Sequence, residues 1–302
     1  MENNINYQNF NYKLYIFLNR DVVTDVSLEN IDSSEEIKSG AWFHYINHGI
    51  YEERPTQILN NTKTHNGRLG NIFFINMVCH FLALKFNLTI DYKYKSQFNK
   101  LGIKFFSGNN HFDDHLYYDL TETNFIEIIN FSSIPKNIMI TNNIWCQQED
   151  FVNDIKKYWY YKFNQNTIIN HNKFKERYKS NDDLFIHVRL GDIKDKTISL
   201  EDYYINSISN LKWDRGYIAS DSLDHHLCKN LIEKFSLIPL IYDEVETIMF
   251  GSTCNKIILS GGTFSWLIGF FAFYTQTIIY PEIKNPWYGK IFENMGWQVL
   301  NV

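Results

Sequence analysis

A histidine, an arginine and an aspartate lie close together in the segment IHVRLGD, Ile186 to Asp192, which continues a short apolar run. Alternate side chains of a β-strand share a face, so His187 and Arg189 are expected on the same side, with Gly191 ending the strand. The planar guanidinium of Arg189 can bind two phosphate oxygens at once. The segment therefore predicts a phosphate site in which Asp192 holds Arg189 in place and His187 hydrogen-bonds the phosphate, ribose or base. A buried ion pair beside a hydrogen-bonded histidine is the alternative interpretation.

A second segment joins a short apolar strand to an apolar helix. The predicted strand, Lys256 to Leu259, runs into Ser260 to Ser265, where two glycines are followed by Thr263, Phe264 and a serine. Free backbone N–H groups at a helix N-terminus bind anions. The segment is therefore a candidate phosphate-binding turn, and an ordinary capped turn is the alternative.

Two further segments combine glycine, amide or acidic residues at the ends of expected elements. Asn66 to Asn71 (NGRLGN) precedes a predicted helix, and its glycines allow the backbone to approach a ligand closely. Asn71 is expected at or just before the start of that helix, where an N-cap is its alternative role. Ile218 to Asp221 ends a predicted strand, and Asp221 suits either the N–H groups of a guanine edge or the cap of the next helix.

Strands and helices alternate along most of the chain. Short runs of apolar residues predict strands, and longer runs with apolar residues at helical spacing predict helices. Such alternation is typical of parallel sheets covered on both faces, so we expect an α/β fold. The expected strands are 88–92, 137–141, 184–188, 216–219, 256–259 and 277–280, and the expected helices are 72–86, 150–163, 200–211, 223–235 and 265–274.

Composition restricts the class of protein and its partners. The formal net charge of −5 disfavours nucleic-acid binding, which needs a basic surface. The four cysteines form no CxxC pair, which disfavours a zinc site and a disulfide scaffold and indicates a reducing compartment. The N-terminus lacks a signal-like pattern, and the longest apolar run, Trp266 to Tyr274, is too short to cross a bilayer. We therefore expect a cytoplasmic protein without a membrane span.

Residues 1–60 are expected to form a small helical module. Asp32 with Glu35 three positions later resembles a capping box, and Gly49 is a C-terminal stop signal. The side chains expected on the buried face of this helix are Ile37, Trp42, Tyr45 and Ile46.

No metal site is predicted. His44 and His48 stand one helical turn apart, but no acidic or cysteine ligand follows at a suitable interval, so aromatic packing is expected instead. The HFDDH segment, 111–115, is interpreted as a polar loop.

Taken together, and in the order in which they occur along the chain, the four candidate segments resemble the fucosyltransferases of the α1,2 type and their more distant α1,6 and protein-O-fucosyl relatives. The resemblance covers about Thr64 to Val302. The family pattern HxRxGD matches His187, Arg189, Gly191 and Asp192, its G-x-L-G-N start matches Gly67, Leu69, Gly70 and Asn71, its SD segment matches Ser220 and Asp221, its S-x-x-S-F-S-W segment resembles Ser260 to Trp266, and its W-Q-x-x-x-F run resembles Trp145 to Phe151. A separate stretch, Ala41 to Pro55, resembles a short helical module found beside glycosyltransferase domains.

The resemblance implies a GT-B fold, with two Rossmann-like lobes facing a cleft, at 61–175 on the acceptor side and 176–302 on the donor side, after the N-terminal module. It implies transfer of L-fucose from GDP-fucose to a glycan hydroxyl with inversion, in α1,2 linkage and without a required metal. Arg189 at the β-phosphate and Asn71 at the reaction centre are the expected catalytic residues. The expected donor-binding residues are His187, Arg189, Asp192, Gly70, Asn71, Ser220, Asp221, Thr263, Phe264 and Ser265.

Two departures from the family pattern leave alternatives open. The second arginine of the α1,2 enzymes is Leu190 here, and the glutamine that usually follows the asparagine is Ile72. The linkage and the acceptor therefore stay open. One alternative is a GT-B glycosyltransferase that uses another nucleotide sugar, and another is a carbohydrate-binding protein with a degenerate donor site and no catalysis.

Overall fold

The chain forms two compact units that interleave along the sequence. The computed structural model describes residues 7–8, 10, 12, 15–16, 34–49, 62–63, 65–110, 117–122, 124–133, 136–140, 144–149, 165–190, 200–282, 286, 289–293 and 295–301. The first unit comprises Met1–Asn66, Val78–Lys93 and Phe106–Ile144, and the second comprises Gly67–Met77, Tyr94–Phe105 and Trp145–Val302. The predicted domains, 1–60, 61–175 and 176–302, were each a single continuous segment, whereas each observed unit is made of three separate segments.

The second unit is built on a six-stranded parallel sheet, which confirms the predicted α/β class. Its strand order is β5-β4-β3-β6-β7-β8. The chain order reverses between β3 and β6, as in a doubly wound, Rossmann-like sheet. The strands are β3 (Leu184–Val188), β4 (Gly216–Ser220), β5 (Ile238–Pro239), β6 (Lys256–Ile258), β7 (Thr277–Glu282) and β8 (Gln298–Asn301).

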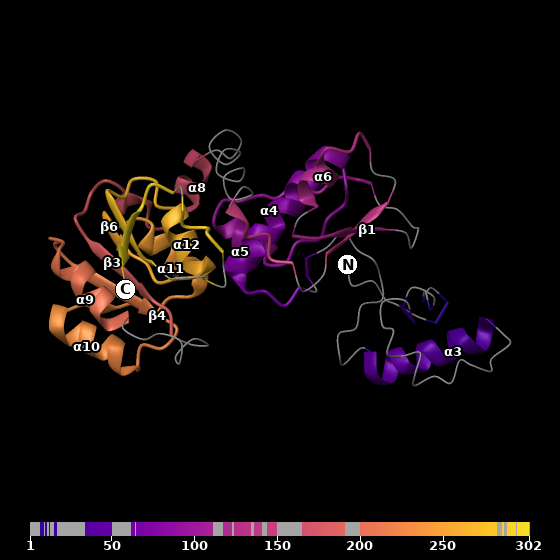
Figure 1. Cartoon of the computed structure of the whole chain (residues 1–302), viewed down its shortest axis with the longest axis horizontal. Helices are drawn as coiled ribbons and strands as arrows, with labels where there is room; N and C mark the ends of the chain where they lie inside the picture. Colours follow the sequence, from indigo (N-terminus) through magenta and orange to yellow (C-terminus); the bar gives the residue numbers. More distant parts are fainter. Residues whose placement is uncertain are drawn as a thin grey trace. The chain divides into compact units, whose positions relative to one another are not determined.

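Helices cover both faces of this sheet (Figure 1). On one face, Leu184, Ile186 and Val188 of β3 belong to a cluster that includes residues of α9 (Leu200–Ser209) and α10 (His226–Phe235). On the other face, the Phe185 ring packs so closely on Gly251 that an added Cβ there would lie 2.7 Å from it. Gly251 ends α11 (Glu244–Gly251), which packs beside α12 (Thr263–Phe270). All five residues of β3 are buried, which explains why its sequence is a nearly continuous apolar run.

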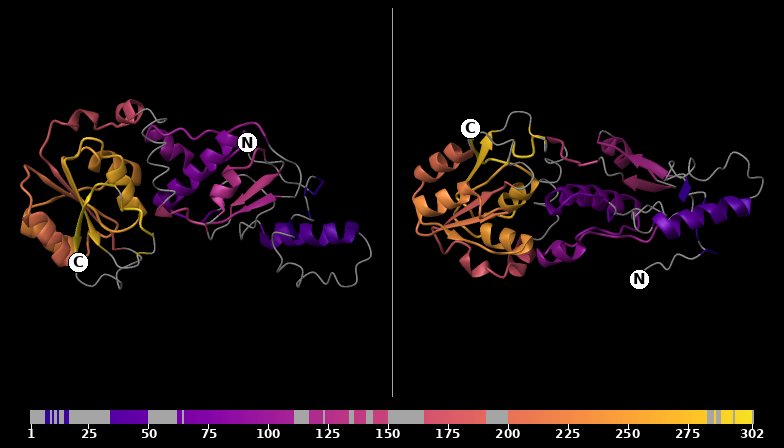
Figure 2. Two further views of the ribbon diagram at one scale, coloured as in Figure 1. Left: turned by 45° about the horizontal axis from the view of Figure 1, so that its top comes forward. Right: turned by 90° about the horizontal axis from the view of Figure 1, so that it is seen from below.

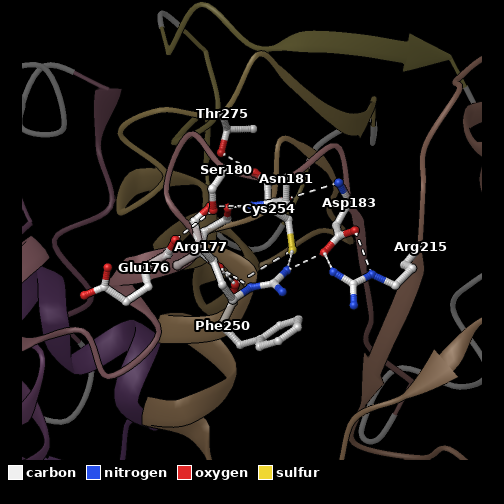
Figure 3. Close-up of polar contacts among 10 residues, drawn as sticks. Glu176, Arg177, Ser180, Asn181, Asp183, Arg215, Phe250, Cys254 and Thr275 are labelled. Atoms are coloured by element: carbon white, nitrogen blue, oxygen red, sulfur yellow. Dashed lines mark hydrogen bonds and ion pairs between the residues drawn. The ribbon is translucent and has the colours of Figure 1, made fainter.

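A cluster of polar contacts around Arg177 and Asp183 joins the segments before β3, β4 and β6 (Figure 3). Asp183, directly before β3, accepts a 2.8 Å hydrogen bond from Nη2 of Arg177 and lies 3.4 Å from Nε of Arg215. The Arg177 guanidinium lies over the Phe250 ring at 4.3 Å and contacts Sγ of Cys254 at 3.4 Å. Because these residues precede β3, β4 and β6 or lie in α11, the cluster ties four elements together.

The first unit contains a two-stranded parallel sheet of β1 (Tyr117–Leu120) and β2 (Asn137–Ile140), with α6 (Phe125–Ile129) between them in sequence. Figure 2 shows the two strands side by side. The predicted strand at 88–92 is wrong, because this segment contains isolated bridge residues, with Leu88 bridged to Asn110, instead of a continuous strand. The Ile90 N–H donates to the Ser107 hydroxyl at 2.9 Å rather than to a neighbouring strand.

The N-terminal module contains α3 (Ser34–His44), which continues as the π-helix η2 (Tyr45–Gly49) and so ends at the predicted glycine. Phe10, Tyr15 and Ala41 form its buried cluster, with Trp42 and Tyr45 packed against them. The expected burial of Ile46 is wrong, since this side chain is 36% exposed. The change to π winding alters the angle between successive side chains and so moves the apolar face. Asp32 and the side chain of Ile37 lie outside the described residues.

Helix α4 (Leu69–Phe86) begins three residues before the predicted start at residue 72. By length and composition alone it is the one helix in the described ranges that could cross a membrane, and it is longer than the apolar run considered above. Of this window, 78% is buried inside the structure. The core helix of a soluble protein passes the same test of length and composition.

Other boundaries differ from the sequence prediction by a few residues. Helix α10 begins at His226 rather than at residue 223, and α12 covers Thr263–Phe270 rather than 265–274. The predicted helix at 150–163 lies outside the described residues. Elements that were not predicted are α5 (Lys95–Lys100), α6, α8 (Gln165–His171), the 3₁₀-helix η3 (Lys175–Arg177), α11, β1, β5 and β8.

Candidate functional site

A cavity of about 220 Å³ lies at the carboxyl ends of β3 and β4, beside the turn between β6 and α12. A second cavity in the described part of the chain has a volume of about 10 Å³, which holds little more than one water molecule. All residues around the larger cavity belong to the second unit. They include most of the predicted donor-binding residues, namely Gly70, Asn71, His187, Arg189, Ser220, Asp221, Thr263 and Phe264.

The position of this cavity follows from the sheet topology. Strand β3 has β4 on one side and β6 on the other, and the chain order reverses between β3 and β6. Crossover helices leave such a sheet in opposite directions at this point, so a crevice opens outside the carboxyl ends of the strands. Ligands of open α/β sheets bind in that crevice.

His187 lines the cavity with its ring fixed by two serines. Its Nδ1 lies 2.5 Å from the Ser265 hydroxyl and 3.2 Å from the Ser260 hydroxyl, and these hydroxyls lie 2.8 Å apart. Burial lowers the pKa of His187 to about 4, the charge of Arg189 lowers it further and Asp221 opposes the shift. The imidazole is therefore neutral near pH 7. Because the serines occupy Nδ1, Nε2 is the nitrogen that a ligand in the cavity can meet.

Ser265 does not line the cavity, although it was among the expected donor-binding residues. It is 1% exposed and lies behind the histidine ring. The Tyr204 hydroxyl donates to the backbone carbonyl of His187 at 3.0 Å and so holds the end of β3 from α9. This support could not be predicted from the sequence, because no local pattern links the histidine to residues that lie 17 and 78 positions away.

Arg189 lines the cavity, whereas its neighbour Leu190 points into the core. Leu190 is 2% exposed and packs in the cluster beneath α9 and α10. Its backbone N–H donates to Oδ1 of Asp221 at 2.9 Å, so this carboxylate fixes the chain just after the arginine. Asp221 is not a helix cap, because His225 occupies the N-cap of α10. The predicted partner Asp192 lies outside the described residues.

Asn71 lies in the first turn of α4 rather than at its N-cap, because the helix begins at Leu69. Its Oδ1 accepts hydrogen bonds from the Thr263 hydroxyl at 2.7 Å and from Nε2 of Gln147 at 3.1 Å. Since the acceptor side of the amide is occupied, Nδ2 is the group that can donate to a ligand in the cavity.

Gly70 serves packing as well as the cavity. A Cβ at this position would lie 2.6 Å from the backbone nitrogen of Phe264 and 2.7 Å from Oγ1 of Thr263. The first turn of α4 and the first turn of α12 therefore touch through a residue without a side chain. The glycine that the sequence assigned to close approach of a ligand also permits close approach of two helices.

One wall of the cavity comes from elements that the sequence did not predict. It consists of residues after β5 and in α11, namely Leu240, Tyr242, Glu244 and Thr247. A local signal for α11 existed: the Asp243 side chain accepts the Glu246 N–H at 2.7 Å, which is the Asp-x-x-Glu pattern of a helix start. Ser220, at the end of β4, also lines the cavity and accepts the Ser222 N–H at 3.0 Å.

In the part of the chain that the structure describes, no group of three or more His, Cys, Asp or Glu side chains could hold a metal ion. His44 is buried and its Nδ1 lies 2.9 Å from the Tyr15 hydroxyl, beside the His48 ring. The HFDDH segment lies outside the described residues.

No protein-family model matches this chain, and no curated protein matches it. The function must therefore be inferred from the residues around the cavity.

Proposed function

We propose that this protein is a glycosyltransferase that moves L-fucose from GDP-fucose to a hydroxyl of a glycan acceptor, with inversion and in α1,2 linkage. The observation that supports it most is the cavity at the reversal of strand order, lined by Arg189, His187 and the first turn of α12. The two-lobe GT-B arrangement, the cytoplasmic location and the independence from metal belong to the same proposal.

The diphosphate of the donor is assigned to Arg189 and to the start of α12. A guanidinium binds two oxygens of a phosphate in a planar fork, and the first N–H groups of a helix have no partner within it. Thr263 and Phe264 at the start of α12 line the same cavity as Arg189. A guanidinium and the first turn of a helix thus border the same cavity, as binding of a diphosphate requires.

In the proposed reaction, an oxygen of the acceptor hydroxyl attacks C1 of fucose from the face opposite the phosphate. The bond between C1 and the β-phosphate oxygen breaks, GDP leaves with the electron pair, and the proton of the acceptor hydroxyl passes to solvent water. Negative charge grows on the β-phosphate as the bond breaks, so the Arg189 guanidinium stabilises the transition state more than the ground state.

His187 and Asn71 have supporting roles in this mechanism. With a pKa of about 4 caused by burial, His187 contributes a hydrogen bond from a neutral ring rather than a charge. The Asn71 amide, oriented by Thr263 and Gln147, directs its NH₂ group to the donor. Groups that are already oriented need no rearrangement during the reaction.

The core position of Leu190 favours a working donor site over a degenerate one. An arginine at this position would have to bury its charge in the cluster that contains Leu190, at a cost that only a paired partner would offset. The position of the family's second arginine is thus a core position in this protein, where leucine fits and a charged side chain does not. Ile72, likewise, is fully buried, so the replaced glutamine also falls on a core position.

Calorimetric titration with GDP-fucose, GDP-mannose, UDP-galactose and GDP, first without metal and then with manganese, tests the proposal. We expect GDP and GDP-fucose to bind equally well with and without metal. Preferential binding of GDP-mannose or UDP-galactose would instead support a glycosyltransferase with another donor. Failure of every nucleotide to bind, together with binding of glycans, would support a carbohydrate-binding protein without catalysis.

A further inference from the structure

We propose that Tyr242 and Glu244 form a guanine subsite, in which the base stacks on the Tyr242 ring and the Glu244 carboxylate accepts the two N–H groups of the guanine edge. This inference rests on the proposed function, because it assigns the base of the donor nucleotide. Neither residue was among the predicted site residues, and both line the wall formed after β5.

The order of groups along the sheet edge matches the order of groups in a nucleoside diphosphate. Arg189 follows β3, Asp221 follows β4, and Tyr242 and Glu244 follow β5, which is the outermost strand on that side. With the phosphates at β3, the ribose reaches β4 and the base reaches the segment after β5. An acidic residue at the end of the second strand in such a sheet binds the ribose hydroxyls, which is the position of Asp221.

Asp221 is less suited than Glu244 to a guanine edge. A guanine edge presents two neighbouring donors, N1–H and N2–H, which pair with both oxygens of one carboxylate. Oδ1 of Asp221 already accepts the Leu190 N–H at 2.9 Å. In the described part of the chain, neither oxygen of Glu244 takes part in a hydrogen bond or ion pair. Adenine presents an acceptor at N1, so the Glu244 carboxylate would repel it.

Tyr242 offers a supported aromatic surface. The residue is 38% exposed, and its ring centroid lies 5.6 Å from that of Phe174 and 5.7 Å from that of Phe250. The Leu240 N–H donates to the Ile218 carbonyl at 2.8 Å, and Asp243 caps α11 directly after Tyr242. Because both ends of this short segment are fixed, the ring is held in place before a base arrives, as stacking requires.

The charges near Glu244 are consistent with a carboxylate that faces the cavity. Burial raises the pKa of the Tyr94 hydroxyl, the charge of Glu244 raises it further and the charge of Arg68 lowers it. Arg68 also lines the cavity. The cavity that Glu244 lines is therefore also lined by a cation, whose charge opposes the repulsion between Glu244 and the donor phosphates.

Calorimetry with GDP, IDP and 2′-deoxy-GDP tests the subsite, because IDP lacks only the 2-amino group and 2′-deoxy-GDP lacks only one ribose hydroxyl. We expect the wild-type protein to prefer GDP to IDP by about ten- to a hundredfold, as for loss of one hydrogen bond to a charged group. Glu244→Gln should reduce this preference to less than about threefold and leave the preference over 2′-deoxy-GDP unchanged. Glu233→Gln, which removes an exposed carboxylate of α10, is the matched control and should behave as wild type.

Tyr242→Ala should weaken GDP and IDP alike, by about tenfold or more, without changing their ratio. If Glu244→Gln binds GDP but keeps the wild-type preference over IDP, the subsite assignment is overturned while the proposed function stands. The same holds if Asp221→Asn abolishes that preference instead. If the wild-type protein binds neither GDP nor IDP, the proposed function fails as well.

Discussion

Strand β3 carries polar groups at both of its ends, and the two ends satisfy them differently. At the amino end, Asp183 is 1% exposed and pairs with Arg177 and Arg215. At the carboxyl end, His187 and Arg189 line a cavity of about 220 Å³. Similar residue types thus close one end of the strand and leave the other open to a ligand.

The difference shows how an arginine's surroundings decide its role. Two nitrogens of the Arg177 guanidinium have protein partners: Nε donates to Thr253 at 3.0 Å, and Nη2 contacts Asp183 and Cys254. Burial raises the pKa of the Cys254 thiol to about 12, so the sulfur is a neutral contact. Arg189 instead lines a cavity, which is why the proposed phosphate contact is assigned to it and not to Arg177.

The largest effect is expected at the closed end. Asp183→Ala should lower the free energy of unfolding by about 3 kcal/mol, because it leaves two arginines beside a site that no longer holds their partner. Urea denaturation followed by tryptophan fluorescence measures this. Arg215→Ala is the matched control: its side chain is 60% exposed, so the cost should stay below about 1 kcal/mol. Equal stability of Asp183→Ala and the wild-type protein would show that the ion pairs at the amino end of β3 do not stabilise the fold.

The next effect is expected at the open end. Arg189→Ala should reduce fucose transfer by about 10²-fold or more, because the transition state loses a donor to the leaving phosphate. The unfolding midpoint should change little, since this side chain lines a cavity. Arg177→Ala should show the reverse, with reduced stability and normal nucleotide affinity per folded molecule. If a folded Arg189→Ala protein transferred fucose at a near-normal rate, the carboxyl end of β3 would have no catalytic role that sets it apart from the amino end.

Much of the sheet could be predicted because burial on both faces leaves a simple pattern. Strand β3 was predicted with its observed bounds, and β4, β6 and β7 to within two residues. Strand β5 has only two residues, both exposed, so it carries neither an apolar run nor an alternation. Strand 88–92 was predicted from its apolar residues, but loop groups satisfy its backbone instead of a partner strand.

The site could be predicted only where strand ends point to it. His187 lies near the carboxyl end of β3, Arg189 follows β3 and Asp221 follows β4, so the rule that ligands bind at carboxyl ends was enough to bring them together. The bond between Thr263 and Asn71 joins residues 192 positions apart, and no local pattern encodes it. The same limit explains why Ser265 was placed on the ligand rather than behind the histidine.

The smallest effect is a pH dependence that belongs to the open end. Burial lowers the pKa of His187 from its usual 6.5 to about 4, so protons bind the unfolded state more readily. The stability from this group is complete above about pH 6.5 and is lost as the pH falls towards 4, by about 2 kcal/mol between pH 7.5 and 5. His187→Gln should remove this part of the slope in urea titrations at several pH values.

Two comparisons isolate the histidine in that experiment. His80, in the first unit, also has its pKa lowered to about 4 by burial, so the wild-type slope contains both groups and only the difference between proteins reports His187. Arg177→Ala should keep the wild-type slope, because an arginine does not titrate in this range. If the unfolding free energy of His187→Gln depended on pH as steeply as that of the wild-type protein, the imidazole would have to be solvated in the folded state. That result would contradict the structure, in which His187 is only 6% exposed.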